Sequence, residues 1–347
     1  MDKIRTIFIG TSEFGIYALQ KLIQDKYFNM LAVITQPDKK IGRQQVLSYT
    51  PIKKQAKKFN ISVLQPEKIL NCKTEITKLN PELVVVASYG QIIPKEILNI
   101  PKYGCINIHA SLLPKYRGAS CIQAAILNGD KKTGITIMKM DEHLDTGPIL
   151  NQVEIKINTI ETLETLHYKL ALLSAKILPL VLENYINGKI KLILQNSAHA
   201  SYVKILKKSD GEINCQKSAV EIECMIRALN PWPGAWTLVK RMPWAKAQGQ
   251  KHALSAGSKA CPERKRRVKS NLILKILQVQ HNPLVVNKYK QGQLFLDNNK
   301  LAIQCGKDSL VIEKLQLEGK RAMEASEFLK GHESIINYQL RIKLINL

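Results

Sequence analysis

Three polar residues of the N-terminal half could act together on a carbonyl group. Asn107 and His109 lie two residues apart in the apolar run Cys105–His109, which predicts a short buried strand. Because side chains alternate along a strand, Asn107 and His109 point to the same side of its carboxyl end. Asp145 follows the next apolar strand, predicted over 134–140. An amide, an imidazole and a carboxylate in this arrangement can stabilise an oxyanion and move a proton.

Each of these residues also has an ordinary structural explanation. A His at the end of a strand is more often structural than catalytic, and Asp145-Thr146-Gly147 is also a typical turn sequence. Cys121 could be taken for a nucleophile, but the sequence shows no separate base for it, so we interpret it as structural. The spacing alone therefore indicates a site without identifying it.

The elements that must position these residues alternate between strands and helices. This pattern predicts an α/β fold with a doubly wound, mostly parallel sheet, in which ligands bind at the carboxyl ends of the strands. A long helix is predicted from a cap at Asn158 or Thr159 to about Tyr185, with Leu180 in its apolar stripe. Further strands are predicted over 6–9, 30–35, 62–64, 83–87 and 152–157, helices over 14–25 and 51–59, and a polar loop over 36–50.

The chain of 347 residues is long enough for two domains. We predict an N-terminal domain over 1–188, a linker over 189–207 and a C-terminal domain over 208–335. The C-terminal domain is expected to contain a helix at 219–229 followed by short strands. The stretch at about 240–270 is rich in Lys, Arg, Ala, Gly and Ser and has no period, which is typical of a disordered insertion.

Composition restricts the compartment and the partners. The formal net charge of +24 favours a nucleic-acid partner. The seven cysteines are scattered without a C-x-x-C pair, which favours a reducing compartment and argues against a disulfide framework or a Cys-based zinc site. The chain begins directly with a strand rather than a signal peptide, and no apolar run approaches the roughly 20 residues that cross a bilayer. We therefore expect a cytoplasmic monomer without a membrane partner.

Three motifs, in this order and at this spacing, resemble the formyltransferases that use 10-formyltetrahydrofolate. They are Asn107-x-His109, Ser111-Leu112-Leu113-Pro114-x-Tyr116-Arg117-Gly118 and Leu144-Asp145-Thr146-Gly147. Two other segments are similar to the methionyl-tRNA formyltransferases in particular. These are the loop with Gly42-Arg43 after Thr35-Gln36-Pro37-Asp38, and Asn230-Pro231-Trp232-Pro233 in the C-terminal part. The resemblance covers nearly the whole chain except the insertion.

The resemblance implies that a formyl group passes from 10-formyltetrahydrofolate to the α-amine of methionyl initiator tRNA. Asn107 and His109 would donate hydrogen bonds to the tetrahedral oxyanion. Asp145 would orient His109, raise its pKa and help to remove the amine proton. The reaction needs no metal, and no metal-ligand spacing is present in the sequence.

The resemblance also implies where the two substrates bind. The folate would lie against Tyr89-Gly90 and the loop Ser111-Leu112-Leu113-Pro114, with positive charge from Lys115 and Arg117 beside it. Arg43 would contact the acceptor stem of the tRNA. The C-terminal domain would be a small OB-like β-barrel that binds tRNA, and we expect its tryptophans to lie in the barrel core.

The sequence departs from the family pattern at three places. His143 replaces a Gly that is usual before Leu-Asp-Thr-Gly, so we expect backbone strain or a different loop there. Gln44, Gln45 and Val46 stand where Gly and lysines are usual, which should weaken phosphate attraction. Ser120-Cys121 replaces a small residue and Pro.

Three alternatives remain open. A phosphoribosylglycinamide formyltransferase shares the Asn/His/Asp set but is usually shorter and lacks the C-terminal domain. A 10-formyltetrahydrofolate hydrolase would use water as acceptor, which the basic charge and the second domain disfavour. A non-catalytic RNA-binding relative is disfavoured by the intact Asn107, His109 and Asp145.

Overall fold

The computed structural model describes residues 2–41, 45–240 and 271–331. By its internal contacts the chain divides into two compact units, Met1–Leu206 and Lys207–Leu347. Each unit has a main sheet of its own. Apart from Lys240, the predicted insertion at 240–270 lies outside the described residues.

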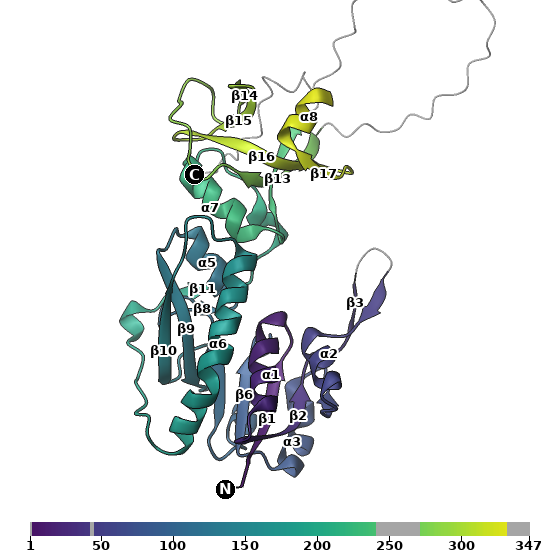
Figure 1. Ribbon diagram of the computed structural model, residues 1–347, viewed down its shortest axis with the longest axis vertical. Coiled ribbons are helices and arrows are strands. Elements are labelled where there is room, and N and C mark those ends of the chain that lie inside the picture. Colours follow the sequence, from purple (N-terminus) through teal and green to yellow (C-terminus); the bar gives the residue numbers. More distant parts are fainter. Residues whose placement is uncertain (1, 42–44, 241–270, 332–347) are drawn as a thin grey trace, which may run out of the picture. The chain divides into compact units, whose positions relative to one another are not determined.

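The first unit is built on a seven-stranded sheet with the order β10-β9-β7-β6-β1-β2-β5 (Figure 1). Its strands are β1 (Ile4–Gly10), β2 (Phe28–Ile34), β5 (Val63–Leu64), β6 (Leu83–Ala87), β7 (Cys105–His109), β9 (Lys132–Lys139) and β10 (Ile149–Lys156). Strands β1, β2, β5, β6 and β7 are parallel, whereas β9 is antiparallel to both β7 and β10. This confirms the predicted doubly wound, mostly parallel sheet.

Helices cover the sheet. They are η1 (Glu13–Gly15), α1 (Ile16–Gln24), α2 (Pro51–Lys58), η2 (Ile69–Cys72), α3 (Lys73–Leu79), α4 (Lys95–Leu98), α5 (Cys121–Leu127) and α6 (Leu163–Ile186). Helix α6 packs against α1 and β9. Its cap is Thr162, which forms a capping box with Thr165, so the predicted cap at Asn158 or Thr159 is wrong. Leu180 was expected in the apolar stripe but is 63% exposed.

Helix α6 is an exception to the expectation that no segment is long and apolar enough to cross a membrane. By length and composition it is the one helix among the described residues that is long and apolar enough to do so. Half of its most apolar window is buried inside the unit, and Leu166, Leu170 and Leu178 are fully buried. Core helices of globular proteins pass the same test, so this is weak support for a membrane span.

The segment predicted as a polar loop after β2 contains two short strands. Strand β3 (Lys39–Ile41) pairs antiparallel with β4 (Val46–Ser48), and the hairpin extends away from the sheet (Figure 1). Helix α2 begins directly after it at Pro51, with Thr50 as its cap.

The segment expected as a linker lies within the first unit by internal contacts. Ile193 forms an isolated antiparallel bridge with Ile149. Strand β11 (Tyr202–Val203) pairs parallel with β8 (Arg117–Gly118), and the short helix η3 (Ser197–His199) lies between these anchors in sequence. Much of this segment is therefore attached to β8 and β10 of the first unit rather than free of them.

The second unit contains an antiparallel sheet with the order β12-β13-β16-β15-β14 and with β17 beside β16. Its elements are η4 (Lys208–Gly211), α7 (Ala219–Leu229), β12 (Ala235–Lys240), β13 (Asn271–Val279), β14 (Leu294–Asp297), β15 (Lys300–Gln304), β16 (Ser309–Leu317), β17 (Ala322–Glu324) and α8 (Ala325–Gly331). Apolar residues such as Ile222, Leu274, Ile303, Leu315 and Phe328 form one core. Between the described strands no pairing closes a barrel.

Neither of the two described tryptophans of the second unit is fully buried in the core. Trp232 is 55% exposed in the turn after α7, so the expectation that it lies in the core is wrong. Trp236 is half-buried because β12 buries the alternate positions Ala235, Thr237 and Val239. The indole N–H of Trp236 donates to the Lys208 carbonyl at 3.0 Å. Trp244 lies outside the described residues.

Candidate active site

The structure brings Asn107, His109 and Asp145 together at one edge of the first unit's sheet. Asn107 Nδ2 donates to Asp145 Oδ1 at 3.3 Å, and His109 Nδ1 lies 3.6 Å from Asp145 Oδ2. The first two side chains come from the carboxyl half of β7, as their spacing predicts. Asp145 comes from the loop that joins β9 to β10. One strand and one loop therefore supply the three groups.

Asp145 is fixed through both its side chain and its backbone. The Gly118 N–H donates to Asp145 Oδ2 at 2.8 Å, and Gln195 Nε2 donates to the Asp145 carbonyl at 2.9 Å. The φ of Asp145 is 53°, in the left-handed region. Ser88 and Tyr116 also adopt positive φ, and such strained residues cluster at functional sites.

His109 is buried and its pKa is raised from 6.5 to about 9. Burial acts to lower this pKa, but the Cys121 side chain, the Asp145 carboxylate and the Tyr116 carbonyl together raise it. Its Nε2 lies 2.9 Å from the Tyr116 carbonyl oxygen. The direction of this shift agrees with the one expected from Asp145. The Cys121 side chain is thus a neighbour of the His109 ring.

The loop Ser111–Pro114 is held by side chains from β9 and β10. Thr136 Oγ1 donates to the Ser111 carbonyl at 2.6 Å and accepts from the Leu113 N–H at 3.1 Å. Gln152 Nε2 donates to the Leu113 carbonyl at 2.7 Å. Leu113 is buried, whereas Leu112 and Pro114 are half-buried. Sequence reasoning missed Thr136 and Gln152. The only sign of them in the sequence is that each is a polar residue within a predicted strand.

Tyr89 and Gly90, the second and third residues after β6, have different surroundings. The Tyr89 side chain is 3% exposed within a hydrophobic cluster, and its hydroxyl has no hydrogen-bond partner among the residues that the structure describes. Burial raises the pKa of Tyr89 to about 12. Only its carbonyl is engaged, by Thr11 Oγ1 and Gln36 Nε2. Gly90 has a φ of +83°, and a Cβ there would lie 2.8 Å from Gln36 Nε2. The Tyr89 side chain is therefore enclosed, whereas Gly90 is exposed.

The departures from the family pattern are accommodated locally. His143 is exposed and its backbone is not left-handed, so the strain expected at this residue is absent. Its N–H donates to Asp141 Oδ1 at 3.1 Å, and the Thr146 hydroxyl donates to the same carboxylate. The left-handed residue of this turn is Asp145 instead.

The basic residues beside the motifs divide into two kinds. Lys115 is exposed and pairs with Asp130 at 2.8 Å. Arg117 is 1% exposed, so it is neither a solvated charge nor a surface charge for a ligand. Its guanidinium contacts Gln195 and Tyr202.

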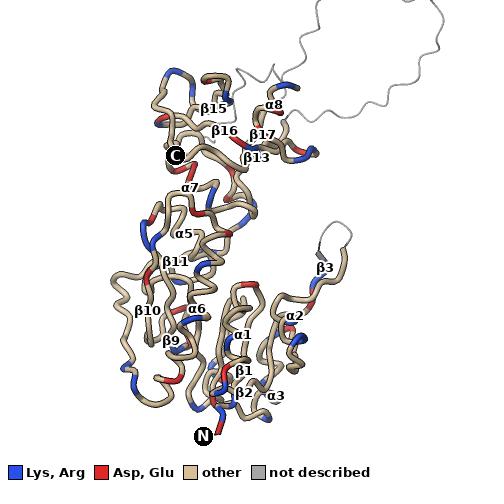
Figure 2. Tube along the Cα trace, in the orientation of Figure 1, with Lys and Arg blue, Asp and Glu red and all other residues tan. Residues whose placement is uncertain are grey.

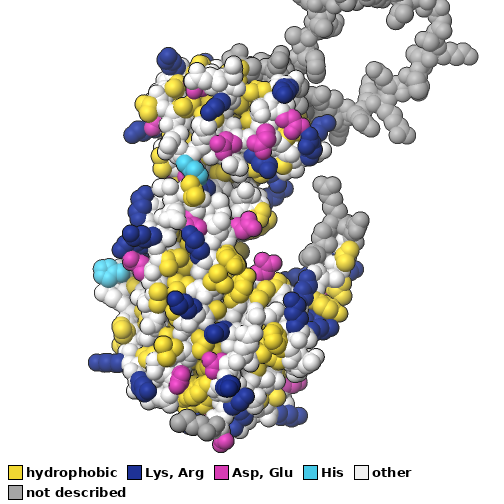
Figure 3. Space-filling model, viewed as in Figure 1, with side chains coloured by type: hydrophobic (Ala, Val, Ile, Leu, Met, Phe, Trp, Pro, Cys, Tyr) yellow, Lys and Arg dark blue, Asp and Glu magenta, His cyan; other side chains and the backbone are white. Residues whose placement is uncertain are grey.

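Arg43, the residue predicted to contact tRNA, lies outside the described residues. Lysines gather on α2 and also stand in β3 of the hairpin (Figures 2 and 3). Lys53 Nζ and Lys57 Nζ lie 4.2 and 4.3 Å from the centre of the Tyr49 ring. Val46 is 59% exposed in the hairpin.

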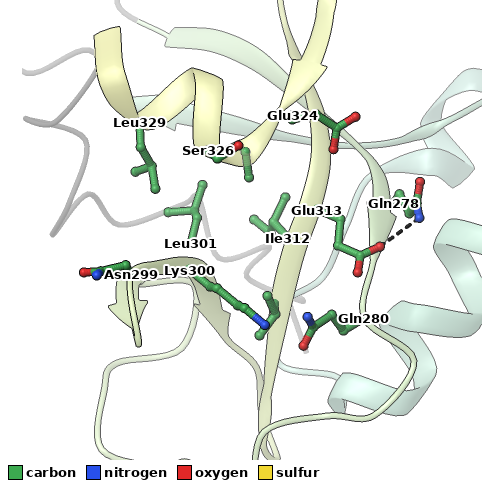
Figure 4. A pocket seen from close by; sticks show the side chains of 12 residues that line it. Gln278, Gln280, Asn299, Lys300, Leu301, Ile312, Glu313, Glu324, Ser326 and Leu329 are labelled. Carbon is green, nitrogen blue, oxygen red and sulfur yellow. Dashed lines mark hydrogen bonds between the residues drawn. The ribbon is translucent and has the colours of Figure 1, made fainter.

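Within the described ranges, no group of three or more His, Cys, Asp or Glu is arranged to hold a metal. The second unit has an open hollow of about 460 Å³ (Figure 4). Its polar lining includes Glu313, Glu324 and Gln278, and Gln278 donates to Glu313 at 2.8 Å. None of the predicted site residues lines it.

Comparison with known proteins assigns this arrangement to a family. Residues 3–182 match the model of the formyl transferase family, and residues 205–333 match that of the formyl transferase C-terminal domain. The methionyl-tRNA formyltransferase of Caldicellulosiruptor saccharolyticus is 41% identical over 332 residues, which are 94% of this chain and 96% of the relative. The chain belongs to the methionyl-tRNA formyltransferase family.

Two further relatives in this family match as completely. The methionyl-tRNA formyltransferase of Caldanaerobacter subterraneus subsp. tengcongensis is 39% identical and covers 95% of this chain and 97% of its own. That of Legionella pneumophila (strain Paris) is 36% identical and covers 99% and 100%. The resemblance inferred from the motifs is thereby confirmed.

Solved structures share the fold of this methionyl-tRNA formyltransferase family member. The sugar 3N-formyl transferase WlaRD, solved with dTDP and 5-N-formyl-THF, aligns with a TM-score of 0.59 at 21% identity over 92% of this chain and 100% of its own. An N-formyltransferase from Helicobacter canadensis, solved with folinic acid and dTDP-3-aminofucose, aligns with a TM-score of 0.60 at 17% identity over 89% and 98%. At these identities the likeness concerns the fold.

Proposed function

We propose that this chain transfers the formyl group of 10-formyltetrahydrofolate to the α-amine of methionyl initiator tRNA, with Asn107, His109 and Asp145 as the catalytic residues. The observation that carries the proposal is the convergence of these three side chains in a chain of this family. An amide, a raised-pKa imidazole and a carboxylate within hydrogen-bonding reach of one another suit acyl transfer to an amine.

Asn107 and His109 stabilise the oxyanion that forms when the amine attacks the formyl carbon. The Asn107 amide uses one N–H on Asp145 and keeps a second for the oxyanion. His109 Nδ1 faces Asp145 at 3.6 Å, beyond a good hydrogen bond, so an oxygen that enters beside it can take that hydrogen. Such donors each contribute about 3 to 4 kcal/mol to the transition state.

Asp145 completes the reaction by helping to remove the amine proton. Its carboxylate already accepts from Asn107 and Gly118, which fixes its direction before substrate arrives. As the tetrahedral species collapses, the bond from the formyl carbon to N10 breaks and N10 takes up a proton. The products are formylmethionyl-tRNA and tetrahydrofolate, and the balance requires no metal or oxidant.

The donor and the tRNA are assigned to different surfaces. The folate binds along the backbone of Gly90 and the loop Ser111–Pro114, which Thr136 and Gln152 hold in place. Arg43 and the lysines of α2 contact the tRNA, together with the second unit. By this assignment residues 1–188 form the folate-binding, catalytic domain and residues 208–335 the tRNA-binding domain of a cytoplasmic monomer.

The test is formyl transfer from 10-formyltetrahydrofolate with methionyl initiator tRNA and glycinamide ribonucleotide as rival acceptors. We expect transfer to the tRNA alone, lost in His109→Ala and retained in the control His143→Ala, whose side chain is exposed. Transfer to glycinamide ribonucleotide, or formate release with water as acceptor, would support one of the other enzyme classes. Tight tRNA binding without transfer to any acceptor would mean that the chain is a non-catalytic relative.

A further inference from the structure

Arg117 is a buried cation for which the proposed chemistry has no use. Its side chain is 1% exposed. Nε and Nη2 donate to Gln195 Oε1 at 3.1 and 2.9 Å, Nη1 donates to Tyr202 Oη at 2.8 Å, and Nη2 lies 3.4 Å from Ser197 Oγ. Within the described ranges, all of these acceptors are neutral. Burying a charge without a carboxylate partner is costly.

Gln195 connects this cation to the turn that carries Asp145. While its Oε1 accepts from Arg117, its Nε2 donates to the Asp145 carbonyl at 2.9 Å and to the Gly147 carbonyl at 2.8 Å. A guanidinium offers only donors and a carbonyl only acceptors. An amide has both an acceptor and donors, so the Gln195 side chain can bond to the guanidinium and to the two backbone carbonyls at once. These neighbours fix the orientation of the amide.

The strand that carries Arg117 also holds the Asp145 carboxylate. Arg117 is followed by Gly118, whose N–H donates to Asp145 Oδ2 at 2.8 Å. Gly118 has a φ of +110°, and a Cβ on it would lie 2.3 Å from the Val203 carbonyl oxygen. Strand β8 thus holds the side chain of Asp145 while Gln195 holds its backbone, which keeps the residue at its left-handed φ of 53°.

Both ends of the segment that carries Gln195 are anchored in the first unit. Ile193 exchanges two backbone hydrogen bonds with Ile149, at 2.8 and 3.0 Å. At the other end the Arg117 N–H donates to the Ser201 carbonyl at 2.8 Å, and Tyr202 pairs with Arg117 in register. Gln195 is consequently a fixed support rather than a side chain on a loose connection.

We propose that Arg117 and Gln195 form a positioning pair that holds Asp145 in the orientation needed for formyl transfer. Neither residue touches the reacting atoms; both act through Asp145. The proposal rests on the proposed function, because it assumes that the Asp145 carboxylate serves the reaction.

Gln195→Glu is the sharpest test, since it keeps an acceptor for Arg117 but turns carboxylate oxygens toward the Asp145 and Gly147 carbonyls. We expect kcat for formyl transfer to fall by about 10- to 100-fold, because small displacements of a catalytic group cost this much. The KM for methionyl-tRNA should stay within about twofold. The matched control is Asn196→Asp, which adds the same charge one residue later at an exposed position and keeps the oxygen that caps Ala198. Wild-type kcat in a folded Gln195→Glu protein would overturn the proposal.

A second measurement separates positioning from a general loss of structure. In Gln195→Met the amide is gone, so the Asp145 carboxylate should move away from the imidazole and the NMR-titrated pKa of His109 should fall below its wild-type value. An unchanged His109 titration in this variant would also overturn the proposal. If the wild-type chain transfers formyl to no acceptor, the proposed function fails, and the titration still decides whether the pair positions Asp145.

Discussion

The turn around Asp145 and the hairpin of β3 and β4 both belong to the first unit and both follow a strand of its sheet, yet they are built in opposite ways. At the turn, both the carboxylate and the backbone carbonyl of Asp145 have hydrogen-bond partners from segments far away in sequence. The carbonyl of Gly147, two residues later, also has such a partner. In the hairpin, the described backbone pairs with itself, and Val46 and Leu47 are 59% and 60% exposed.

The difference follows from what each region is proposed to do. Formyl transfer requires the reacting groups to be held within fractions of an ångström, so their supports must be buried and hydrogen-bonded. Attraction to tRNA phosphates acts over longer distances and tolerates variable geometry. Substitutions at the turn should therefore change kcat, whereas substitutions at the hairpin should change the KM for tRNA and its salt dependence.

The largest effect is expected from Asn107→Ala. Loss of an oxyanion donor should lower kcat by about 100- to 1000-fold with little change in the KM for tRNA. Asn71→Ala, at an exposed position of η2, is the matched control and should have wild-type kinetics. If Asn107→Ala retained most of its kcat, the contrast between the two regions would lose its basis.

The next effect concerns the charge on His109. Because its pKa is about 9 in the folded chain and 6.5 ordinarily, protonation stabilises the fold. This contribution is fully present below pH 6.5 and is lost as the pH rises through about 9. The shift corresponds to about 3 kcal/mol. The difference in the free energy of unfolding between wild type and His109→Gln should shrink by about this amount between mildly acidic and strongly alkaline pH, as followed by urea denaturation. A difference independent of pH would mean that the imidazole is neutral in the folded chain.

An effect of similar size is expected from the close approach at Gly118. Gly118→Ala should lower the free energy of unfolding by about 3 kcal/mol, because the new Cβ meets the Val203 carbonyl in addition to the positive φ. Gly188 also has a positive φ, of +69°, but no atom lies within 4 Å of the position that a Cβ would take there. Gly188→Ala should therefore cost only about 1 kcal/mol. If Gly118→Ala and Gly188→Ala lost equal free energy of unfolding in thermal or urea denaturation, β8 would not approach β11 closely.

The smallest effect is expected at the hairpin. Arg43→Ala should raise the KM for methionyl-tRNA a few-fold and reduce the salt dependence of tRNA binding by about one phosphate contact, while kcat is retained. Lys78→Ala, at an exposed position of α3, provides a control for the loss of one positive charge. A large drop in kcat for Arg43→Ala would place the hairpin in the chemistry and remove its distinction from the turn.

The sequence by itself determined the local elements and the identity of the chemical groups. Strands β6 and β7 and helix α7 have the predicted bounds, because each is encoded by its own periodicity and its own flanking residues. Asn107 and His109 could be named as candidates because their spacing places both on one side of β7, and Asp145 because its motif resembles that of the family.

Only the tertiary structure decided which residues support that set. Gln195 contacts Arg117 across 78 residues and Asp145 across 50 residues, and no local pattern encodes pairs so far apart. For the same reason the stretch 189–207 was expected to be a linker although much of it is anchored in the first unit. Arg117 was expected to supply positive charge beside the folate although it is buried. Leu180 and Trp232 were misplaced because burial depends on which face a neighbouring element covers, and that is settled only when the elements pack.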